Sequence, residues 1–295
     1  MFNNLISLVT YNTQFCTGLD GQTDINRIIS EIKTADIICL QEIDRYWKRS
    51  GMIDQAKIIA SLIPKYYWAF GPGIDVDSSM VSDDGQAVNR RRQHGNMILS
   101  RWPLLAVRNH LLPKMELGKP FSSQRAALEV IIDLFGKACR VYSVHLAHAS
   151  AKEREKQILQ LLSIIDHSHH DGRAWSGTDI PKEWATEGPE LPLTRSIVVA
   201  GDFNLTPDSN EYIELCRPMH FKYDPPSTKN RLSDGWLITG NDRSSGHTMI
   251  NHNPLRRLDY ILVNNDVADQ VETMWVNDQA TGSDHKPLWA KIRWP

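Results

Sequence analysis

Several short apolar segments of this sequence, each rich in β-branched residues, stop at a polar or charged residue. The clearest are residues 5–12, which end on Asn12, residues 36–42, which end on Glu42, and residues 197–202, which end on Asp202. Segments of this length and composition are typical of buried strands. A buried strand fixes the side chain at its end, and binding sites are commonly built at such ends. We therefore expect a fold organised around sheets with polar groups at their edges.

Other segments have the spacing of amphipathic helices. Asp24 is expected to cap a helix whose apolar stripe runs from Ile25 to Ile32. This helix lies between two of the expected strands, and a strand–helix–strand opening places helices on the outside of a sheet. Further helices are expected at 55–63, at 149–166 and, opened by Asp208 or Ser209, up to Cys216.

The rest of the chain adds strands and two long irregular segments. A series with short polar breaks, interpreted as antiparallel neighbours, lies at 95–100, 104–112, 125–134 and 139–145. Other strands are expected at 66–70, 258–263, 271–276 and 288–292. Residues 71–93 are interpreted as a long polar loop and residues 167–193 as a second insertion. Because no linker divides the chain, we expect a single domain over residues 1–295.

Composition and charge narrow the class of protein only moderately. With 41% hydrophobic and 23% charged residues, the chain is expected to be globular with a sizeable core. The formal net charge of −2 gives no global attraction to nucleic acid or acidic membranes, although a local basic patch would suffice. The four cysteines lack CxxC spacing and are interpreted as reduced and structural. No leader peptide and no apolar run of membrane-spanning length is evident, so we expect a cytoplasmic protein without a transmembrane segment.

The polar residues at the expected strand ends form a set suited to a hard cation. They are Asn12, Glu42, His145, Asp202, Asn204, Asp259, Asp284 and His285. Adjacent residues of a strand point to opposite faces, so the last two can share a site only from a loop at a strand end. Gly282 and Pro287 mark such a loop. Carboxylate and amide oxygens suit Mg²⁺ or Mn²⁺, whereas a zinc site would use cysteines or closely spaced histidines.

Six motifs, spread from the first expected strand to the last, together resemble one known family, the endonuclease/exonuclease/phosphatase superfamily. In chain order they are Val9-Thr10-Tyr11-Asn12, Gln41-Glu42, Val141-Tyr142-Ser143-Val144-His145-Leu146, Gly201-Asp202-Phe203-Asn204, Arg257-Leu258-Asp259-Tyr260-Ile261 and Ser283-Asp284-His285-Lys286-Pro287. Each motif is short, but the complete ordered set is specific and covers essentially the whole chain. The resemblance implies an α/β fold: a four-layer α/β sandwich in which two packed, mostly antiparallel sheets are flanked by helices.

The same resemblance implies roles for the residues that match. Glu42 is expected to be the principal Mg²⁺ ligand, supported by Asn12, and Asp284 is expected to contact metal as well. Asp202 and Asn204 are expected to position the attacking water or a second metal.

Two histidines complete the implied site. Asp259 is expected to orient His285, and His145 to contact the scissile phosphate or the leaving oxygen. Two versions of the chemistry remain open from the sequence: His285 takes the proton of the attacking water, or Asp202 does so while His285 binds phosphate as a cation.

The expected activity is metal-dependent hydrolysis of a phosphate ester, with a phosphodiester, nucleic acid or another diester, as the leading substrate. The alternatives are an inositol-phosphatase-like phosphomonoesterase, a sphingomyelinase-like enzyme and, from another class, a catalytically silent binding module on the same fold. AP endonucleases tend to have tyrosine where this chain has His145, so the chain is more similar to the DNase, sphingomyelinase and phosphatase branches.

Substrate choice is expected to depend on the loops around the site, residues 71–93, 114–124, 167–193 and 222–248. The first of these ends in Arg90, Arg91 and Arg92, which are candidates for binding substrate phosphate. A three-residue charge run is more often part of a solvated loop. No protein partner is evident from the sequence.

Overall fold

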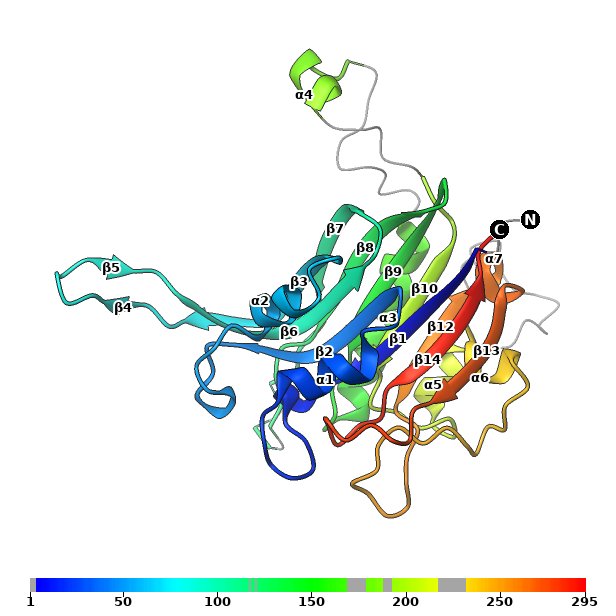
Figure 1. Ribbon diagram of the computed structural model, residues 1–295. Helices are drawn as coiled ribbons and strands as arrows, with labels where there is room; N and C mark the ends of the chain where they lie inside the picture. Colours follow the sequence, from blue (N-terminus) through cyan, green and yellow to red (C-terminus); the bar gives the residue numbers. More distant parts are fainter. Residues whose placement is uncertain (1–3, 117, 120, 169–178, 188–192, 217–231) are drawn as a thin grey trace.

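Two six-stranded sheets, packed face to face, form the centre of the protein (Figure 1). The computed structural model describes residues 4–116, 118–119, 121–168, 179–187, 193–216 and 232–295. Sheet 1 has the strand order β13-β14-β1-β2-β6-β3 and sheet 2 the order β11-β12-β10-β9-β8-β7. In each sheet one pair is parallel, β1 with β2 and β9 with β10, and the other pairs are antiparallel.

The strands of sheet 1 are β1 (Leu5–Asn12), β2 (Ile37–Arg45), β3 (Tyr67–Asp77), β6 (Arg91–Ser100), β13 (Val271–Val276) and β14 (Leu288–Arg293). Those of sheet 2 are β7 (Leu104–Leu111), β8 (Ala126–Leu134), β9 (Lys137–His145), β10 (Ile197–Asp202), β11 (Leu232–Asp234) and β12 (Asp259–Asn264). A separate hairpin consists of β4 (Met80–Val81) and β5 (Ala87–Val88).

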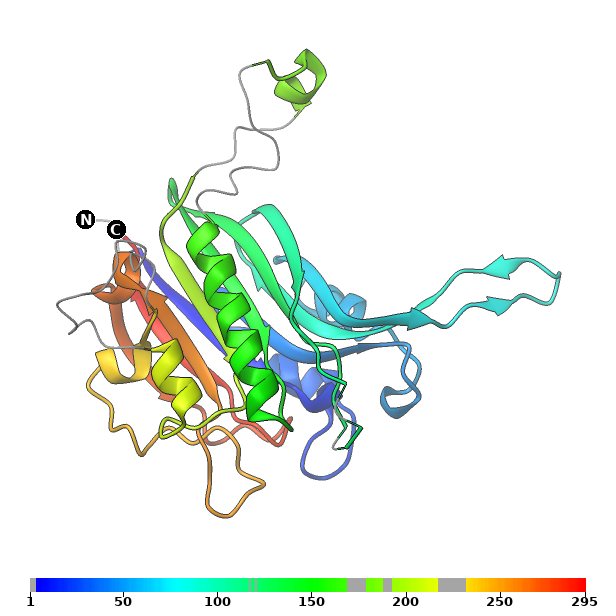
Figure 2. The same ribbon diagram turned by 180° about the vertical axis from the view of Figure 1, so that it is seen from behind.

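Helices cover the outer face of each sheet. On sheet 1, α1 (Ile25–Ile32) and α2 (Gln55–Leu62) bury their apolar sides against β1, β2 and β6. On sheet 2, α3 (Ala151–His167) and α5 (Asn210–Leu215) do the same, as the view from behind shows (Figure 2). The predicted sandwich of two mostly antiparallel sheets flanked by helices is therefore confirmed. The remaining helices are short: η1 (Gln14–Cys16), η2 (Lys48–Ser50), α4 (Lys182–Glu187), α6 (Gly235–Ile238) and α7 (Asn265–Ala268).

The caps of the helices match their sequences. The Asp24 carboxylate accepts a hydrogen bond from the Arg27 backbone N–H at the start of α1, and the Ser209 hydroxyl accepts one from Tyr212 at the start of α5. Each contact satisfies a backbone donor that has no partner inside the helix. In the described part of the chain, no helix has both the length and the hydrophobicity that a bilayer span requires. The four cysteines are unpaired.

Alternation along the strands divides their side chains between two cores. On β1, Ile6 and Leu8 face the core between the sheets, whereas Val9 and Tyr11 face the helices. Asn12 has the parity of Ile6 and Leu8, so it lies on the inner side at the end of the strand. Three other strand-end residues also lie on the inner side: His145 ends β9, Asp202 ends β10 and Asp259 begins β12. One end of the inter-sheet core is therefore polar.

Buried hydrogen bonds connect the sheets just before this polar end. The Gln41 amide on β2 donates to the Ser143 hydroxyl on β9 at 2.9 Å, and that hydroxyl donates to the Leu40 carbonyl at 3.1 Å. The Asn96 amide on β6 donates to the carbonyls of Ala126 and Ser143 at 2.8 and 3.0 Å. Because these groups are fully buried and satisfied, they fix the position of the strand ends relative to one another.

Two sequence-based expectations about the strands are wrong. Residues 71–93 are not a long loop, because β3 and β6 continue as a paired ribbon through Asp77 and Arg91 and carry the β4–β5 hairpin at their end, which projects from the body (Figure 1). The side chains of this ribbon are mostly exposed, so they lack the apolar pattern of a buried strand. The segments 95–100 and 104–112 are not neighbours either. They lie in different sheets, since the chain crosses from sheet 1 to sheet 2 between β6 and β7.

Gly201 on β10 is a position where no side chain fits. A Cβ atom there would lie 1.9 Å from the Val144 carbonyl oxygen, and the residue has a φ of +154°. We expect Gly201→Ala to lower the free energy of unfolding by about 3 kcal/mol, because neighbouring backbone would have to move. Chemical denaturation measures this loss. The control is Gly136→Ala, where φ is +86° but nothing lies within 4 Å of the added carbon, and the expected loss is about 1 kcal/mol. Equal losses in the two variants would contradict the close approach.

Candidate active site

Asn12 connects the carboxylates of the two sheets. Its Nδ2 atom donates to Asp202 Oδ2 at 2.9 Å and lies 3.4 Å from Glu42 Oε1. Glu42 reaches this position through a β-bulge, because the pairing of β2 with β6 shifts register between Leu40 and Ile43 and Glu42 has a φ of +60°. Without the extra residue, alternation would direct Glu42 toward the helices rather than toward the site. Backbone strain of this kind occurs commonly at functional sites.

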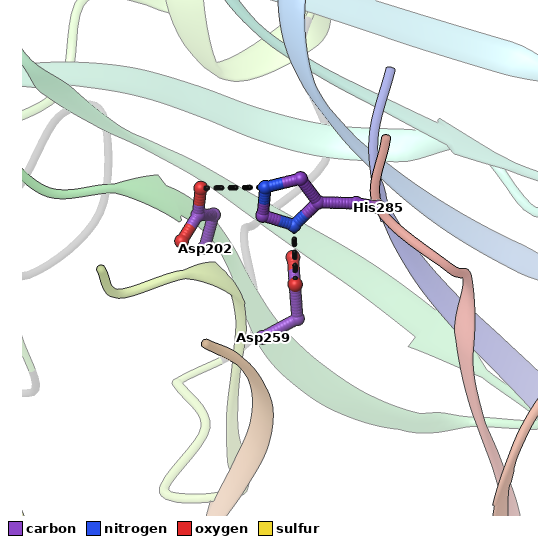
Figure 3. Close-up of side chains that lie close together, drawn as sticks. All are labelled: Asp202, Asp259 and His285. Carbon is purple, nitrogen blue, oxygen red and sulfur yellow. Dashed lines mark hydrogen bonds and ion pairs between the residues drawn. The ribbon is translucent and has the colours of Figure 1, made fainter. Parts of the chain in front are cut away.

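His285 lies between two carboxylates (Figure 3). Its Nδ1 atom is 2.7 Å from Asp259 Oδ2, and its Nε2 atom is 3.8 Å from Asp202 Oδ2. The loop before β14 holds it there: the Ser283 hydroxyl accepts from the His285 backbone N–H at 3.2 Å and donates to the Asn12 carbonyl at 2.7 Å. The expected contact between Asp259 and His285 is therefore present, and its role in orienting the imidazole for catalysis stays a prediction.

Burial and charge shift the pKa values of this group strongly. Burial raises the pKa of Asp202 to about 7, with Asp259 adding to the increase and His285 opposing it. Burial opposes the charged form of His285, but the carboxylates of Asp259 and Asp202 outweigh it and raise its pKa to about 10. Burial also raises the pKa of Asp284, and the charge of Glu42 adds to that increase. A cation held among these carboxylates would lower all of these pKa values.

His145 is held in its neutral form from two sides. Arg125 Nη1 lies 2.9 Å from Nδ1 of His145, and Asn204 Nδ2 lies 3.1 Å from its Nε2. Arginine can only donate, so Nδ1 accepts, the single N–H of the neutral ring is at Nε2, and a second proton on Nδ1 would face the guanidinium. Burial and the Arg125 charge hold the pKa of His145 well below its usual range. Its Nε2 atom lies 3.5 Å from Asp202 and 3.8 Å from Glu42, which places the neutral imidazole beside the carboxylates.

Asn204 is positioned by the turn that follows β10. Its backbone N–H donates to Asp202 Oδ1 at 2.9 Å, its Nδ2 donates to the Leu146 carbonyl at 3.1 Å, and its φ is +52°. Left-handed backbone is tolerated by asparagine better than by most residues. The turn therefore fixes both the carboxylate of Asp202 and the amide beside His145.

Of the eight polar residues predicted at the strand ends, all except Asp259 line one cavity of about 560 Å³. Several residues of the wall are not indicated by the strand-end pattern. Arg125 is the residue before β8 and is 6% exposed, and its Nη2 atom also lies 3.1 Å from His148. A buried arginine at the start of an apolar strand is the one signal that could have identified it. Of the loops expected to select substrate, Ile74, Phe121 and Ser123 contribute to the wall. Parts of the loops 167–193 and 222–248 lie outside the described residues.

A second group of residues that the sequence patterns do not indicate forms one side of the active-site cavity. Buried Asp44 binds Arg49 through two hydrogen bonds of 2.8 and 2.9 Å, and it lies 2.9 Å from His94 Nδ1. The Arg49 guanidinium stacks on the Phe15 ring at 3.6 Å and lies 4.6 Å from the Trp47 ring centroid. These contacts make a stiff, partly aromatic wall. The residues come from three separate segments without a shared spacing, so sequence patterns do not group them.

The three arginines predicted to bind substrate phosphate do not line the active-site cavity. Arg90, Arg91 and Arg92 sit where β5 leads into β6, at the base of the projecting hairpin, and none of the three lines the cavity. Arg91 pairs with Asp75 at 2.7 Å, and Arg92 donates to the Tyr46 carbonyl at 3.0 Å. The structure thus gives these arginines structural partners and does not bring them to the other site residues.

The donor atoms of the site fit a hard divalent cation. In the described part of the chain, the group of closely spaced candidate metal ligands is Asp202, Asp259 and His285, whose donor atoms lie within 4.8 Å of one another. Asp259 and His285 are already hydrogen-bonded to each other, and His285 also faces Asp202. We therefore interpret these three residues as an imidazole paired with two carboxylates and call them the relay. Glu42, Asp202 and Asp284 offer the carboxylate oxygens that Mg²⁺ and Mn²⁺ prefer, and the Asn12 amide faces two of them as a donor.

A family model confirms what this geometry indicates. The model of the endonuclease/exonuclease/phosphatase family matches residues 9–285. The chain belongs to this family. Its members are metal-dependent hydrolases of phosphate esters, and the match covers five of the six motifs in full and Ser283-Asp284-His285 of the last. Among curated proteins, no sequence match is found.

Similar solved structures share the fold. An endonuclease/exonuclease/phosphatase from Beutenbergia cavernae DSM 12333 is 20% identical, with 98% of this chain and 71% of that chain covered and a TM-score of 0.66. A mannosyl-6-phosphatase from Bacteroides thetaiotaomicron VPI-5482 is 15% identical, with 98% and 100% covered and a TM-score of 0.66. A humanized D. rerio TDP2 is 16% identical, with 99% and 100% covered and a TM-score of 0.62.

The relay gives a testable pair of outcomes for Asp259→Asn. Because the carboxylate of Asp259 is the main group that raises the pKa of His285, the imidazole of the metal-free variant should lose its proton well below pH 10. Turnover should fall by about 10³-fold, since an amide cannot support the imidazolium charge. NMR titration of the imidazole and steady-state kinetics measure the two effects. Asp133→Asn, at an exposed position of β8, is the control and should change neither. An unchanged His285 titration in Asp259→Asn would refute the relay.

Proposed function

We propose that this protein is a phosphodiesterase that uses Mg²⁺ or Mn²⁺. The observation that supports the proposal best is the convergence of three carboxylates, Glu42, Asp202 and Asp284, with two imidazoles in one cavity. Such a cluster is costly to bury, and it is suited to holding a cation next to a phosphate. An inactive binding module on the same fold would have no chemical need for the complete set.

In the proposed mechanism, Glu42 would be the principal metal ligand, the Asn12 amide would hold the Glu42 carboxylate in place and Asp284 would add a further oxygen. The bound cation would neutralise charge on the phosphate and stabilise the leaving oxygen. The cavity walls hold the phosphorus in line with the attacking water.

The remaining residues transfer the proton of the attacking water and orient the groups that do so. Asp202, fixed by Asn12 and by the Asn204 backbone, faces His285, so one of these two groups takes the proton of the attacking water. Asp259 keeps the imidazole in place in either version. His145, whose Nδ1 atom accepts from Arg125, contacts the scissile phosphate or the leaving oxygen through its Nε2–H.

A phosphomonoester is the second candidate substrate. A mannosyl-6-phosphatase, an enzyme named for a monoester substrate, shares the fold over its whole length at 15% identity. The sphingomyelinase-like reaction and the cytoplasmic location expected from the sequence stay predictions, as do nucleic acid as substrate and the choice between Mg²⁺ and Mn²⁺.

A substrate panel tests the proposal directly. The metal-free protein is assayed with and without Mg²⁺ or Mn²⁺ on bis-p-nitrophenyl phosphate, p-nitrophenyl phosphate, DNA, RNA, sphingomyelin and inositol phosphates. We expect metal-dependent hydrolysis with the diesters preferred. Preference for the monoesters would move the assignment to the second candidate, and no hydrolysis of any substrate would support the binding module.

Substitutions of the three central residues test the site itself. Glu42→Ala, Asp202→Ala and His285→Ala should each reduce metal-dependent turnover by about 10²-fold or more, because each removes a separate part of the chemistry. Circular dichroism and thermal unfolding confirm that each variant is folded. A folded His285→Ala protein with near-native hydrolysis would refute the assignment.

A further inference from the structure

The loop between β13 and β14, residues 277–287, carries Asp284 and His285 into the candidate active site. Its last part is held by the chain before β12, because the Lys286 N–H donates to the Thr248 carbonyl at 2.7 Å. The part of the loop that precedes Asp284 makes its contacts elsewhere, with α1 on the outer face of sheet 1. These contacts lie outside the cavity and none of them takes part in the proposed chemistry.

Glu31, on α1, binds the backbone of this loop. Its Oε1 atom accepts from the Thr281 N–H at 2.6 Å and from the Gly282 N–H at 3.1 Å. Hydrogen bonds from backbone donors to an ionised carboxylate are stronger than those between neutral groups. Among the described residues that line the active-site cavity, Glu31 is absent, so it acts on the site only through the loop.

Tyr11 fixes the other oxygen of Glu31. The hydroxyl of Tyr11, a fully buried residue, donates to Glu31 Oε2 at 2.9 Å. Burial raises the pKa of Tyr11 and the charge of Glu31 adds to the increase, so this hydroxyl keeps its proton and donates. Tyr11 precedes Asn12 on β1, and the Asn12 carbonyl accepts from the Ser283 hydroxyl of the same loop. One carboxylate therefore joins α1, the end of β1 and the 277–287 loop.

The close approach of the loop to Glu31 depends on Gly282. A Cβ atom at this position would lie 2.7 Å from Ile28 Cδ1 and 2.8 Å from Glu31 Oε2. A side chain would push the carboxylate away from the two N–H groups, so the absence of one is what allows the contact. Asp284 and His285 follow within three residues, and a shift of the backbone here would be passed on to them.

From these contacts we infer that Glu31 is a positioning residue for the relay. It fixes the backbone from which His285 keeps its Nε2 atom 3.8 Å from Asp202 while its Nδ1 atom binds Asp259. Displacements of about 1 Å in a reacting group are enough to lower a rate strongly. The effect of Glu31 on turnover rests on the proposed function, whereas its hold on the loop does not.

Amide hydrogen exchange, followed by NMR on the metal-free protein, tests the hold on the loop without turnover. We expect Glu31→Ala to speed exchange of the Thr281 and Gly282 N–H groups by about tenfold or more, because both lose their acceptor. Glu31→Gln keeps an acceptor oxygen, and its amide can donate to the Tyr11 hydroxyl, so exchange should stay within about threefold of the unsubstituted protein. The matched control is Glu155→Ala at an exposed position of α3, which should leave both rates unchanged. Unchanged exchange in Glu31→Ala, or an equal increase in the control, would overturn the inference.

Steady-state kinetics at saturating Mn²⁺ test the positioning role. We expect Glu31→Ala to lower kcat by about tenfold or more and to change KM by less than about twofold, because the walls that hold the substrate are unchanged. Glu31→Gln should restore most of kcat, and Glu155→Ala should leave it at the native value. Each variant is assayed well below its unfolding midpoint, so a loss of stability alone does not lower kcat.

Two kinetic results would overturn the positioning role: a native kcat in folded Glu31→Ala, or a loss of kcat that Glu31→Gln does not recover. If the unsubstituted protein hydrolyses no ester of the substrate panel, the proposed function fails. The exchange rates of Thr281 and Gly282 then still decide whether Glu31 holds the loop.

Discussion

The two sheets pack face to face, and side chains alternate along every strand, so each second residue of the central strands points into the space between the sheets. Through most of that space these residues are apolar, as Leu8, Val141 and Ala200 are. At one end the same alternation delivers His145 and Asp202, with Asn12 and Asp259 from neighbouring strands. The candidate site is thus the polar end of the central core. Its geometry depends on strand register, which the buried inter-sheet hydrogen bonds hold in place.

Burial at this end has an electrostatic consequence. Carboxylates taken out of water are costly unless donors or cations are close. Asn12, His285 and Arg125 provide part of the compensation, and the raised pKa values of Asp202 and Asp284 show that it is incomplete in the chain alone. A divalent cation would complete it. The proposed metal dependence is therefore consistent with the charge balance as well as with the family to which the chain belongs.

The parts of the fold that the sequence predicts well are those with a strong apolar period. The strands Ile197–Asp202 and Val271–Val276 have the predicted bounds, and the strand-end pattern identified the residues that meet at the polar end. For the ribbon of β3 and β6 the sequence predicts a loop, because its exposed side chains have no apolar period. Arg125 and the Asp44–Arg49 wall were not grouped with the site, because their contacts arise from tertiary packing of separate loops. The prediction that Arg90 binds substrate rests on its charge alone. In the fold its Nε atom donates to the Ser78 carbonyl, away from the active-site cavity.

The central claim is that the carboxylates at this end of the core hold a divalent cation, with Glu42 as the principal ligand. Titration of Mn²⁺ into the metal-free protein, with free Mn²⁺ followed by electron paramagnetic resonance, tests it without any choice of substrate. We predict that the unsubstituted protein and the exposed-site variant Asp133→Asn bind Mn²⁺ alike, and that Glu42→Gln binds it about tenfold more weakly or worse. Equal Mn²⁺ affinity in Glu42→Gln and the unsubstituted protein would contradict the account.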